Sequence, residues 1–305
     1  MTKKQSRQRN GDRANLRQFQ RKILGWYGRF KRDLPWRKTH DPYRILVSEV
    51  MLQQTQVDRV IPKYRAFLKR FPTVAALASA PQRDVVRMWS GLGYNSRALR
   101  LHRAARAIRG MFGGKVPRSV EELEGLPGIG PYTARAIAAF AFQQDTAAVD
   151  TNQNRVMGRY FFGGKKIATK AVRKLATSVL PRGGGYEWNH ALMDFGAMVC
   201  TSRPLCPVCP LQSTCAAYPE VLQQKRTQRS RVSRPFIGSD RFFRGRIIEL
   251  LRRTRAWSSE KEVREKLRQF SHLRSPRLRR LIYDLRDEGF VEQTVRNGQT
   301  FLRLH

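Results

Sequence analysis

One carboxylate in this 305-residue chain occurs in strongly apolar surroundings. Glu49 lies between Val47 and Val50, in a stretch whose apolar pattern predicts a buried helix. Burial disfavours the charged form of a carboxyl group, so we expect the pKa of Glu49 to be raised. Such a group suits a general acid that protonates a leaving group near neutral pH. The alternative is a structural ion pair with an arginine such as Arg44 or Arg59, and burial alone does not separate the two.

Two glycines mark a tight turn between two predicted helices, in the run LEGLPGIGPYTARAIAAFAF at 123–142. Gly128 and Gly130 allow backbone N–H groups at a helix N-terminus to approach a phosphate, a contact that does not depend on base sequence. The alternative is an ordinary helix–turn–helix corner. The chain has 60 Lys and Arg against 23 Asp and Glu, a formal net charge of +37. That excess indicates a polyanionic partner and favours nucleic acid.

Asp150 is the second candidate carboxylate, because it follows the glycine hairpin and directly precedes a helical run. Cleavage of a glycosidic bond passes through an oxocarbenium-like state, which a fixed carboxylate stabilises. The alternative is a helix N-cap, and the two roles are compatible. Capping hydrogen bonds favour the charged carboxylate, so we expect them to lower the pKa of Asp150.

All four cysteines fall between Cys200 and Cys215, with the spacing C-x5-C-x2-C-x5-C. This clustering predicts one ligand set rather than disulfides distributed through a secreted fold. Zinc ribbons normally offer two close pairs, whereas one close pair with two outlying cysteines suits a [4Fe–4S] cubane. Zinc is the alternative metal. The predicted ligands are Cys200, Cys206, Cys209 and Cys215.

Several dispersed motifs resemble those of the A/G-specific adenine DNA glycosylases, the MutY family of helix-hairpin-helix base-excision glycosylases. They are VSEVMLQQTQV at 47–57, GLGYNSRA at 91–98, LPGIGPYTA at 126–134 and the cysteine block. The resemblance extends over about residues 20–218, with the motifs in the family's order. It implies a two-lobed, all-α glycosylase with an iron–sulfur loop at 200–215.

The resemblance also implies roles for individual residues. Glu49 protonates the adenine ring, Asp150 stabilises the oxocarbenium ion or a covalent intermediate, and Tyr132 and Asn152 line the pocket. The endonuclease III branch of the superfamily has a lysine nucleophile at the position of Tyr132. Because a tyrosine cannot form a Schiff base, we expect a monofunctional glycosylase.

For DNA binding, the resemblance implies that Gln54 and Tyr94 wedge into the base stack around the oxidised guanine. Gln53 lies in the same interface, and Gly128 and Gly130 contact the phosphate backbone. A wedge is physically reasonable because extrusion of a base costs a few kcal/mol of stacking that other contacts must offset.

The chain departs from the family's pattern at two places. The first gap of the cysteine block usually has six residues, and here it has five. Asn95 stands where the family often has a second tyrosine, which puts the preference for the oxidised partner base in doubt. The thymine glycosylases of the superfamily share the tyrosine at position 132 but lack the run Gln53-Gln54-Thr55.

Four segments are expected from composition and periodicity. We expect a disordered basic arm at 1–15, the all-α body at 16–218, a basic linker at 219–236, and a small α+β winged-helix-like domain at 237–305. The last is predicted from helices at 242–253, 259–269 and 276–288, followed by a hairpin turning at Asn297-Gly298. Its seventeen Lys and Arg, against nine Asp and Glu, predict a contribution to DNA affinity rather than lesion recognition.

The predicted function is removal of adenine opposite 8-oxoguanine or guanine from double-stranded DNA, in base-excision repair. Two alternatives stay open: a related glycosylase acting on thymine or uracil opposite guanine, and an iron–sulfur winged-helix regulator that is not an enzyme. The sequence has no run long enough to span a membrane and no secretory signal. We therefore expect a monomeric cytoplasmic protein associated with the nucleoid.

Overall fold

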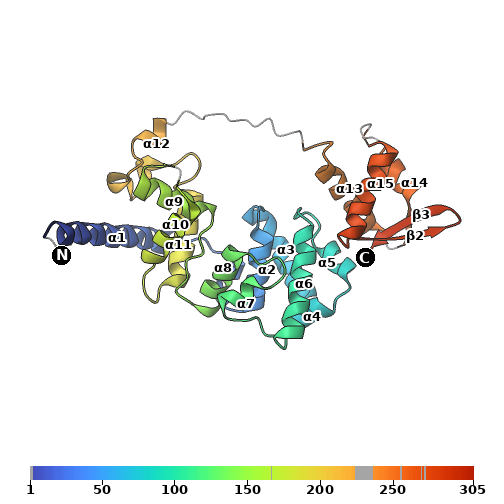
Figure 1. Cartoon of the computed structure of the whole chain (residues 1–305), viewed down its shortest axis with the longest axis horizontal. Helices are drawn as coiled ribbons and strands as arrows, with labels where there is room; N and C mark the ends of the chain where they lie inside the picture. The colour runs from blue at the N-terminus through green and yellow to red at the C-terminus, as the bar shows by residue number, and fades with distance from the viewer. Residues whose placement is uncertain (1–2, 166, 224–235, 255, 269, 271–272) are drawn as a thin grey trace. The chain divides into compact units, whose positions relative to one another are not determined.

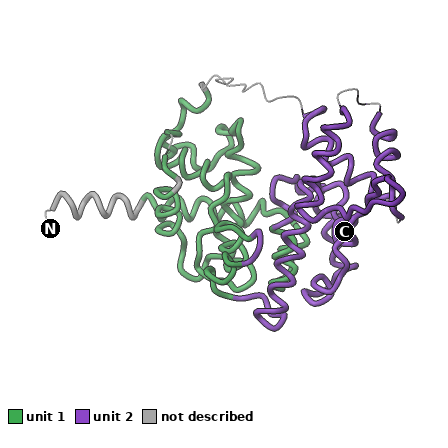
Figure 2. Tube along the Cα trace, turned by 45° about the vertical axis from the view of Figure 1, so that its right-hand side comes forward, with its two compact units in different colours: residues 1–49, 118–125, 129–227 green, residues 50–117, 126–128, 228–305 purple. Residues whose placement is uncertain are grey.

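The computed structural model divides the chain into two compact units (Figure 2). Unit 1 comprises residues 1–49, 118–125 and 129–227, and unit 2 comprises residues 50–117, 126–128 and 228–305. The structure describes residues 3–165, 167–223, 236–254, 256–268, 270 and 273–305. No helix among these residues is long and apolar enough to cross a membrane.

Unit 1 is helical throughout its described residues (Figure 1). Helix α2 (Pro42–Leu52) crosses from unit 1 into unit 2 at residue 50. The other elements of unit 1 are α1 (Lys3–Phe30), the 3₁₀ helix η1 (Pro35–Arg37), α7 (Val120–Glu124), α8 (Pro131–Phe142), α9 (Thr151–Phe162), α10 (Thr169–Ser178), α11 (Gly185–Met198), η2 (Cys206–Val208), η3 (Gln212–Thr214) and α12 (Glu220–Gln223).

The core of unit 1 forms where α1, α9 and α11 pack together. The ring of Phe19 on α1 stacks on Tyr160 of α9 at 4.5 Å between centroids and meets Trp188 of α11 edge-on at 5.6 Å. Helix α1 begins at Lys3, so the expected disordered arm over residues 1–15 is wrong from that residue onward. Lys, Gln and Arg are good helix formers, and they extend a helix that Phe19 and Ile23 already anchor in the core.

Unit 2 contains a helical part and the C-terminal domain. The helical part comprises α3 (Val57–Arg70), α4 (Val74–Ser79), α5 (Gln82–Met88) and α6 (Ser96–Met111). The C-terminal domain comprises α13 (Asp240–Arg253), β1 (Ser258–Ser259), α14 (Glu260–Lys266), α15 (Ser275–Asp287), β2 (Val291–Arg296) and β3 (Gln299–Leu304). The strands form an antiparallel sheet of order β1-β3-β2.

The C-terminal domain has the three helices and the hairpin expected from the sequence. Asn297 and Gly298 form the turn with φ values of 49° and 72°, and Arg296 pairs with Gln299 across it. This is the geometry of a type I′ turn, which Asn-Gly favours. Strand β1 was not expected, because two residues carry too little alternation to be recognised in a sequence.

The units do not follow the boundary expected near residue 219. Residues 50–117 group with the C-terminal domain because they share apolar contacts and hydrogen bonds with it. Val86 of α5 and Leu99 of α6 belong to the same buried cluster as Phe243 and Ile247 of α13. The tertiary grouping therefore joins residues that are far apart in the chain, such as Leu99 and Phe243, 144 positions later.

Candidate active site

Glu49 is buried on α2, as the apolar run around it predicts. Its side chain is only 5% exposed, and Leu46 and Val50 beside it are also buried. The partner of Glu49 is Tyr132, whose hydroxyl donates to Oε2 at 3.0 Å. The alternative of an ion pair with Arg44 is not observed, because Arg44 pairs with Asp41 instead.

Burial raises the pKa of Glu49 to about 7. The hydrogen bond from Tyr132 opposes this rise, the negative charge of Asp150 adds to it, and the positive charge of Arg37 lowers it slightly. Glu49 therefore holds its proton in the neutral range, where a general acid needs it. The expectation of a raised pKa agrees with this direction.

Tyr132 is placed by the turn between α7 and α8, as the second residue of α8 after Pro131. Burial, and then the nearby charges of Glu49 and Asp150, raise the pKa of its phenol well above the usual value. The hydroxyl therefore remains protonated and acts as a hydrogen-bond donor to the Glu49 carboxyl group. It fixes the orientation of that group without supplying a nucleophile.

Asp150 is the N-cap of α9, so the capping alternative is realised. Its Oδ1 accepts from the Gln153 backbone N–H at 2.7 Å, and its Oδ2 accepts from the Asn152 side-chain amide at 2.9 Å. The expectation of a lowered pKa is wrong in its net direction: the pKa of Asp150 is raised, although the capping hydrogen bonds do lower it. Burial is the largest influence and exceeds the opposite effect of the hydrogen bonds from Gln153 and Asn152.

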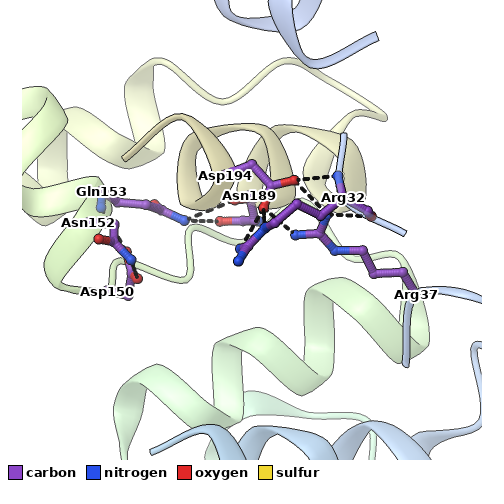
Figure 3. Close-up of polar contacts among 7 residues, drawn as sticks. All are labelled: Arg32, Arg37, Asp150, Asn152, Gln153, Asn189 and Asp194. Atoms are coloured by element: carbon purple, nitrogen blue, oxygen red, sulfur yellow. Dashed lines mark hydrogen bonds and ion pairs between the residues drawn. The ribbon is translucent and has the colours of Figure 1, made fainter. Parts of the chain in front are cut away.

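A buried amide network holds the loop that leads to Asp150 (Figure 3). Asn189 of α11 accepts from the Ala148 backbone N–H at 2.9 Å and donates to the Thr146 carbonyl at 2.9 Å. Its Oδ1 also accepts from the Gln153 side chain at 3.2 Å. Asn189 and Gln153 are almost completely buried, so Asn189 of α11 fixes this loop and Gln153 of α9 fixes Asn189.

A second buried cluster joins α11 to the segment after α1 (Figure 3). Asp194 has no exposed side-chain surface and accepts from Arg32 and Arg37, with Nη1 of Arg37 at 2.7 Å. Burial alone would raise the pKa of Asp194, but the two guanidinium groups lower it below its usual value. These contacts hold Arg37 in place, and its positive charge lowers the pKa of Glu49.

The residues expected to contact DNA bases lie in unit 2, after α2 and between α5 and α6. Gln54 and Tyr94 are exposed and have φ values of 55° and 44°, in the left-handed region that side chains rarely adopt. Gln53 precedes Gln54 in the same turn. Backbone strain of this kind persists only where surrounding contacts impose it, and it concentrates at functional positions.

One buried arginine contacts both of these turns. Arg97 donates to the carbonyls of Val50, Met51 and Gln53 on one side at 2.6–2.9 Å. On the other side it donates to the carbonyls of Leu92 and Gly93 and to the Thr55 hydroxyl. Its pKa is lowered to about 10 by burial, so it remains charged at neutral pH.

The hairpin glycines differ in what they require. Gly128 has a φ of 79°, and a Cβ there would lie 2.6 Å from Cβ of Arg100, so no larger residue fits. Gly130 is the N-cap of α8 and has open space around it. Both are exposed, which leaves the backbone N–H groups of the hairpin accessible to a ligand such as phosphate.

The four cysteines all line one small cavity of about 30 Å³, together with apolar side chains such as Val199 and Leu211. Among the described residues, no set of three His, Cys, Asp or Glu side chains lies close enough to hold a single metal ion. Arg159 of α9 approaches Cys200, with Nη1 at 3.5 Å from Sγ. Four thiols and a guanidinium around one cavity form a donor set that suits an anionic cluster.

Arg155 connects the cysteine loop to Asn152 and Asp150. Its guanidinium donates to the Cys200 carbonyl at 2.7 Å, to the Gly196 carbonyl at 2.7 Å and to Oδ1 of Asn152 at 2.7 Å. Asn152 then donates to Asp150. An unbroken series of hydrogen bonds therefore joins the cysteine loop to the Asp150 carboxylate.

Known proteins are similar to this chain in sequence and in fold. A model of the HhH-GPD superfamily of base excision DNA repair proteins matches residues 47–182. The adenine DNA glycosylase of Mycolicibacterium smegmatis is 40% identical over 282 residues, which cover 90% of this chain and 92% of that protein. The chain belongs to the adenine DNA glycosylase family. It is therefore an N-glycosylase of base-excision repair, and the resemblance found in the sequence is confirmed.

Two further proteins show how far the similarity to this chain extends. The adenine DNA glycosylase of Rattus norvegicus is 44% identical over 226 residues, which cover 70% of this chain but 44% of the rat protein. A solved structure of a thermostable thymine-DNA glycosylase is 33% identical with a TM-score of 0.66, and covers 68% of this chain and 99% of that one. The all-α glycosylase fold with a small α+β domain is confirmed. Because these relatives are enzymes, they favour a glycosylase over a DNA-binding regulator.

Sequence reasoning singled out Glu49 and Asp150 as candidate catalytic carboxylates but missed the residues that hold them. No motif indicates a role for Asn189, Asp194 or Arg97. Arg97 stands inside the quoted run GLGYNSRA, yet its function depends on carbonyls more than forty residues away. The one signal that was available is a polar residue between apolar neighbours in a helix, such as Asp194 between Met193 and Phe195 in α11.

Proposed function

We propose that this protein is a monofunctional glycosylase that removes adenine paired with 8-oxoguanine or guanine in double-stranded DNA. The observation that carries the proposal is the buried Glu49–Tyr132 pair, in which a carboxyl group with a pKa of about 7 is fixed beside Asp150. Two carboxyl groups in different environments supply the acid and the anion that glycosidic cleavage requires.

Glu49 acts as the general acid. Its proton passes to the adenine ring, which makes the base a better leaving group as the bond from sugar to base breaks. Tyr132 keeps the acid oriented by donating to Oε2, so the proton on the carboxyl group is available to the substrate.

Asp150 stabilises the positive charge that develops on the sugar. Hydrogen bonds to both of its oxygens, from Asn152 and Gln153, favour the carboxylate form and fix its position before the charge appears. Tyr132 carries no amine, so the sugar forms no Schiff base with this residue. Borohydride is expected to trap no covalent protein–DNA product; efficient trapping would contradict the monofunctional assignment.

Gln53, Gln54 and Tyr94 act on the base stack, and the Gly128–Gly130 hairpin holds a phosphate. Exposed side chains on strained turns suit a wedge, because they project where the backbone is fixed. Extrusion of the adenine exposes its glycosidic bond to the carboxylates, which no base inside a stacked duplex allows.

Cys200, Cys206, Cys209 and Cys215 hold a [4Fe–4S] cluster. When bound, the cluster cross-links residues 200–215 and supports the Arg155 contacts that reach Asn152. Hydrolysis requires no electron transfer, so the role of the cluster is structural. Iron and sulfide analysis of anaerobically purified protein is expected to give about four of each per chain. Stoichiometric zinc would contradict the assignment.

A cleavage assay on matched duplexes tests the function. Each duplex contains one candidate mispair: adenine opposite 8-oxoguanine, adenine opposite guanine, thymine opposite guanine or uracil opposite guanine. Adenine release from the first two duplexes alone supports the proposal. Release of thymine or uracil instead would favour the activity named for the thymine-DNA glycosylase of similar fold. No release from any duplex would refute the proposed substrate.

A further inference from the structure

One face of α13 contacts the turn that carries Tyr94, here called the Tyr94 loop (residues 89–95). The guanidinium of Arg241 lies over the Tyr94 ring, 3.8 Å from its centroid. Nη2 of Arg252 donates to Oδ1 of Asn95 at 2.7 Å, and the Ser90 hydroxyl donates to Glu249 at 3.3 Å. Each contact joins the C-terminal domain to a different position of the loop.

These contacts are arranged by the geometry of one helix. Residues 249 and 252 follow residue 241 by eight and eleven positions, which are close to two and three helical turns, so the three side chains share a face of α13. The same face is fixed to the helical part of unit 2. Nε of Arg252 donates to the Val86 carbonyl at 3.0 Å, and Val86 lies in the core cluster of the C-terminal domain.

The Tyr94 loop needs external support, because Tyr94 has a φ of 44° and its side chain is 39% exposed. Arg97 supports the loop from within, with its guanidinium 5.7 Å from the Tyr94 ring centroid. Arg241 supplies a second and closer cation from α13. A planar guanidinium over a tyrosine ring is attracted by the ring's electrons and also limits its rotation.

We propose that α13 positions the Tyr94 loop for recognition of the base opposite the adenine, with Arg241 and Arg252 as positioning residues. The C-terminal domain then has a role in partner-base preference, beyond the DNA affinity expected from its charge. Four of the domain's basic side chains are ion-paired within the domain: Arg277, Arg279, Arg280 and Arg286. This inference rests on the proposed function, since it assigns the Tyr94 loop to DNA.

The first experiment measures coupling between Arg241 and Tyr94 in the full-length protein. Single-turnover adenine release at saturating protein is measured on duplexes with 8-oxoguanine or guanine opposite the adenine. Arg241→Gln is expected to slow release opposite 8-oxoguanine about fivefold, the scale of an exposed cation–π contact, and to reduce the preference over guanine. In a Tyr94→Ala background, Arg241→Gln should have no further effect.

Two matched variants separate positioning from charge. Arg244→Gln removes the same charge from α13, but Arg244 pairs with Glu288 inside the domain, so release should be unchanged. Arg241→Lys keeps the charge and loses the planar group, so it should remain impaired. Full rescue by lysine, an equal loss in Arg244→Gln, or a fivefold loss that persists without Tyr94 would each overturn the proposal.

A second readout needs no DNA and no activity. Amide hydrogen exchange of residues 89–98 is compared between the unaltered protein and Arg252→Gln, which removes the hydrogen bond to Asn95. Exchange in this segment is expected to become about fivefold faster, the scale of one hydrogen bond, while exchange in α9 stays unchanged. Unchanged exchange in the loop would overturn the inference. A protein that releases no adenine, yet shows the faster exchange, would instead refute the proposed function alone.

Discussion

The proposed catalytic residues in unit 1 and the proposed DNA-contacting turns in unit 2 are built by opposite means. Glu49 lies in an apolar helix, and burial changes its protonation. Gln54 and Tyr94 are exposed, and their special feature is the backbone, held at positive φ. Chemistry on a base requires a particular proton on a particular atom, whereas insertion into a stack requires a side chain at a fixed place.

The supporting residues differ in the same way. Unit 1 uses neutral amides and an ion cluster centred on Asp194. Asn189 fixes the loop before Asp150, and burial is the largest influence on the pKa of Asp150. Unit 2 uses a cation, Arg97, that donates hydrogen bonds to carbonyl groups of two turns. Changes in unit 1 are therefore expected to alter the rate and pH dependence of release, and changes in unit 2 to alter stability and DNA recognition.

The largest expected effect comes from removing the acid. Glu49→Gln keeps the size of the side chain but has no proton to donate, so adenine release should fall about 1,000-fold, within the range for general acids. Binding to the intact duplex should change little, because the loss falls on the transition state. Single-turnover release and fluorescence binding measure the two quantities. The exposed Glu121→Gln on α7 is the control; normal release by Glu49→Gln would show that the acid lies elsewhere.

Removal of Arg97 tests the other side of the comparison. Arg97→Met removes the guanidinium donor that two turns share, so the free energy of unfolding should fall by about 3 kcal/mol. Urea denaturation measures it. Arg106→Met removes the same charge from an exposed position on the same helix and should cost less than about 0.5 kcal/mol. Equal losses in both variants would mean that the loss of charge, rather than the loss of the carbonyl contacts, causes the effect.

A structural feature could be predicted from the sequence where residues close by in the chain determine it. The burial of Glu49 depends on neighbours within its own helix, and the β2–β3 turn depends on Asn297 and Gly298 alone. The role of Arg97 depends on acceptors contributed by two separate turns, which no local pattern reveals. The pKa of Asp150 shows both cases together. The cap that lowers it is local and was predicted, but the burial that outweighs the cap is tertiary.

A smaller effect is expected from crowding Asn152. A Cβ at Gly196 of α11 would lie 2.6 Å from Cβ of Asn152, so Gly196→Ala must displace one of the two helices. We expect a loss of about 2 kcal/mol of stability from this overpacking. Release should slow about tenfold, because Asn152 then holds Asp150 less well. Gly158→Ala on α9 is the control, since its Cβ meets no atom within 4 Å. Unimpaired release by Gly196→Ala would show that the Asn152 contact to Asp150 is dispensable.

The effect that compares both units in one protein is the dependence on pH. The pKa of Glu49 is raised from 4.5 to about 7, so its carboxyl group loses its proton as the pH rises through about 7. Release should therefore fall about tenfold for each pH unit above that value. Arg97 has a pKa of about 10, so the DNA-contacting turns keep their supporting charge and duplex binding should stay constant to about pH 9.

The same shift has a consequence for stability, whose sign follows from proton linkage. Because the folded-state pKa of Glu49 lies above the unfolded value, its stabilising contribution is fully present below about pH 4.5 and is lost as the pH rises through about 7. In Glu49→Gln this part of the pH dependence should disappear, whereas in Arg97→Met it should remain. Denaturation at a series of pH values tests both.

A release rate that stays flat from about pH 6 to about pH 9 would contradict the role of Glu49 as the proton donor, because an acid with this pKa is ionised over the upper part of that range. Loss of duplex binding over the same range would show that a group titrating near neutrality also supports the turns of unit 2, and the contrast between the two units would then fail.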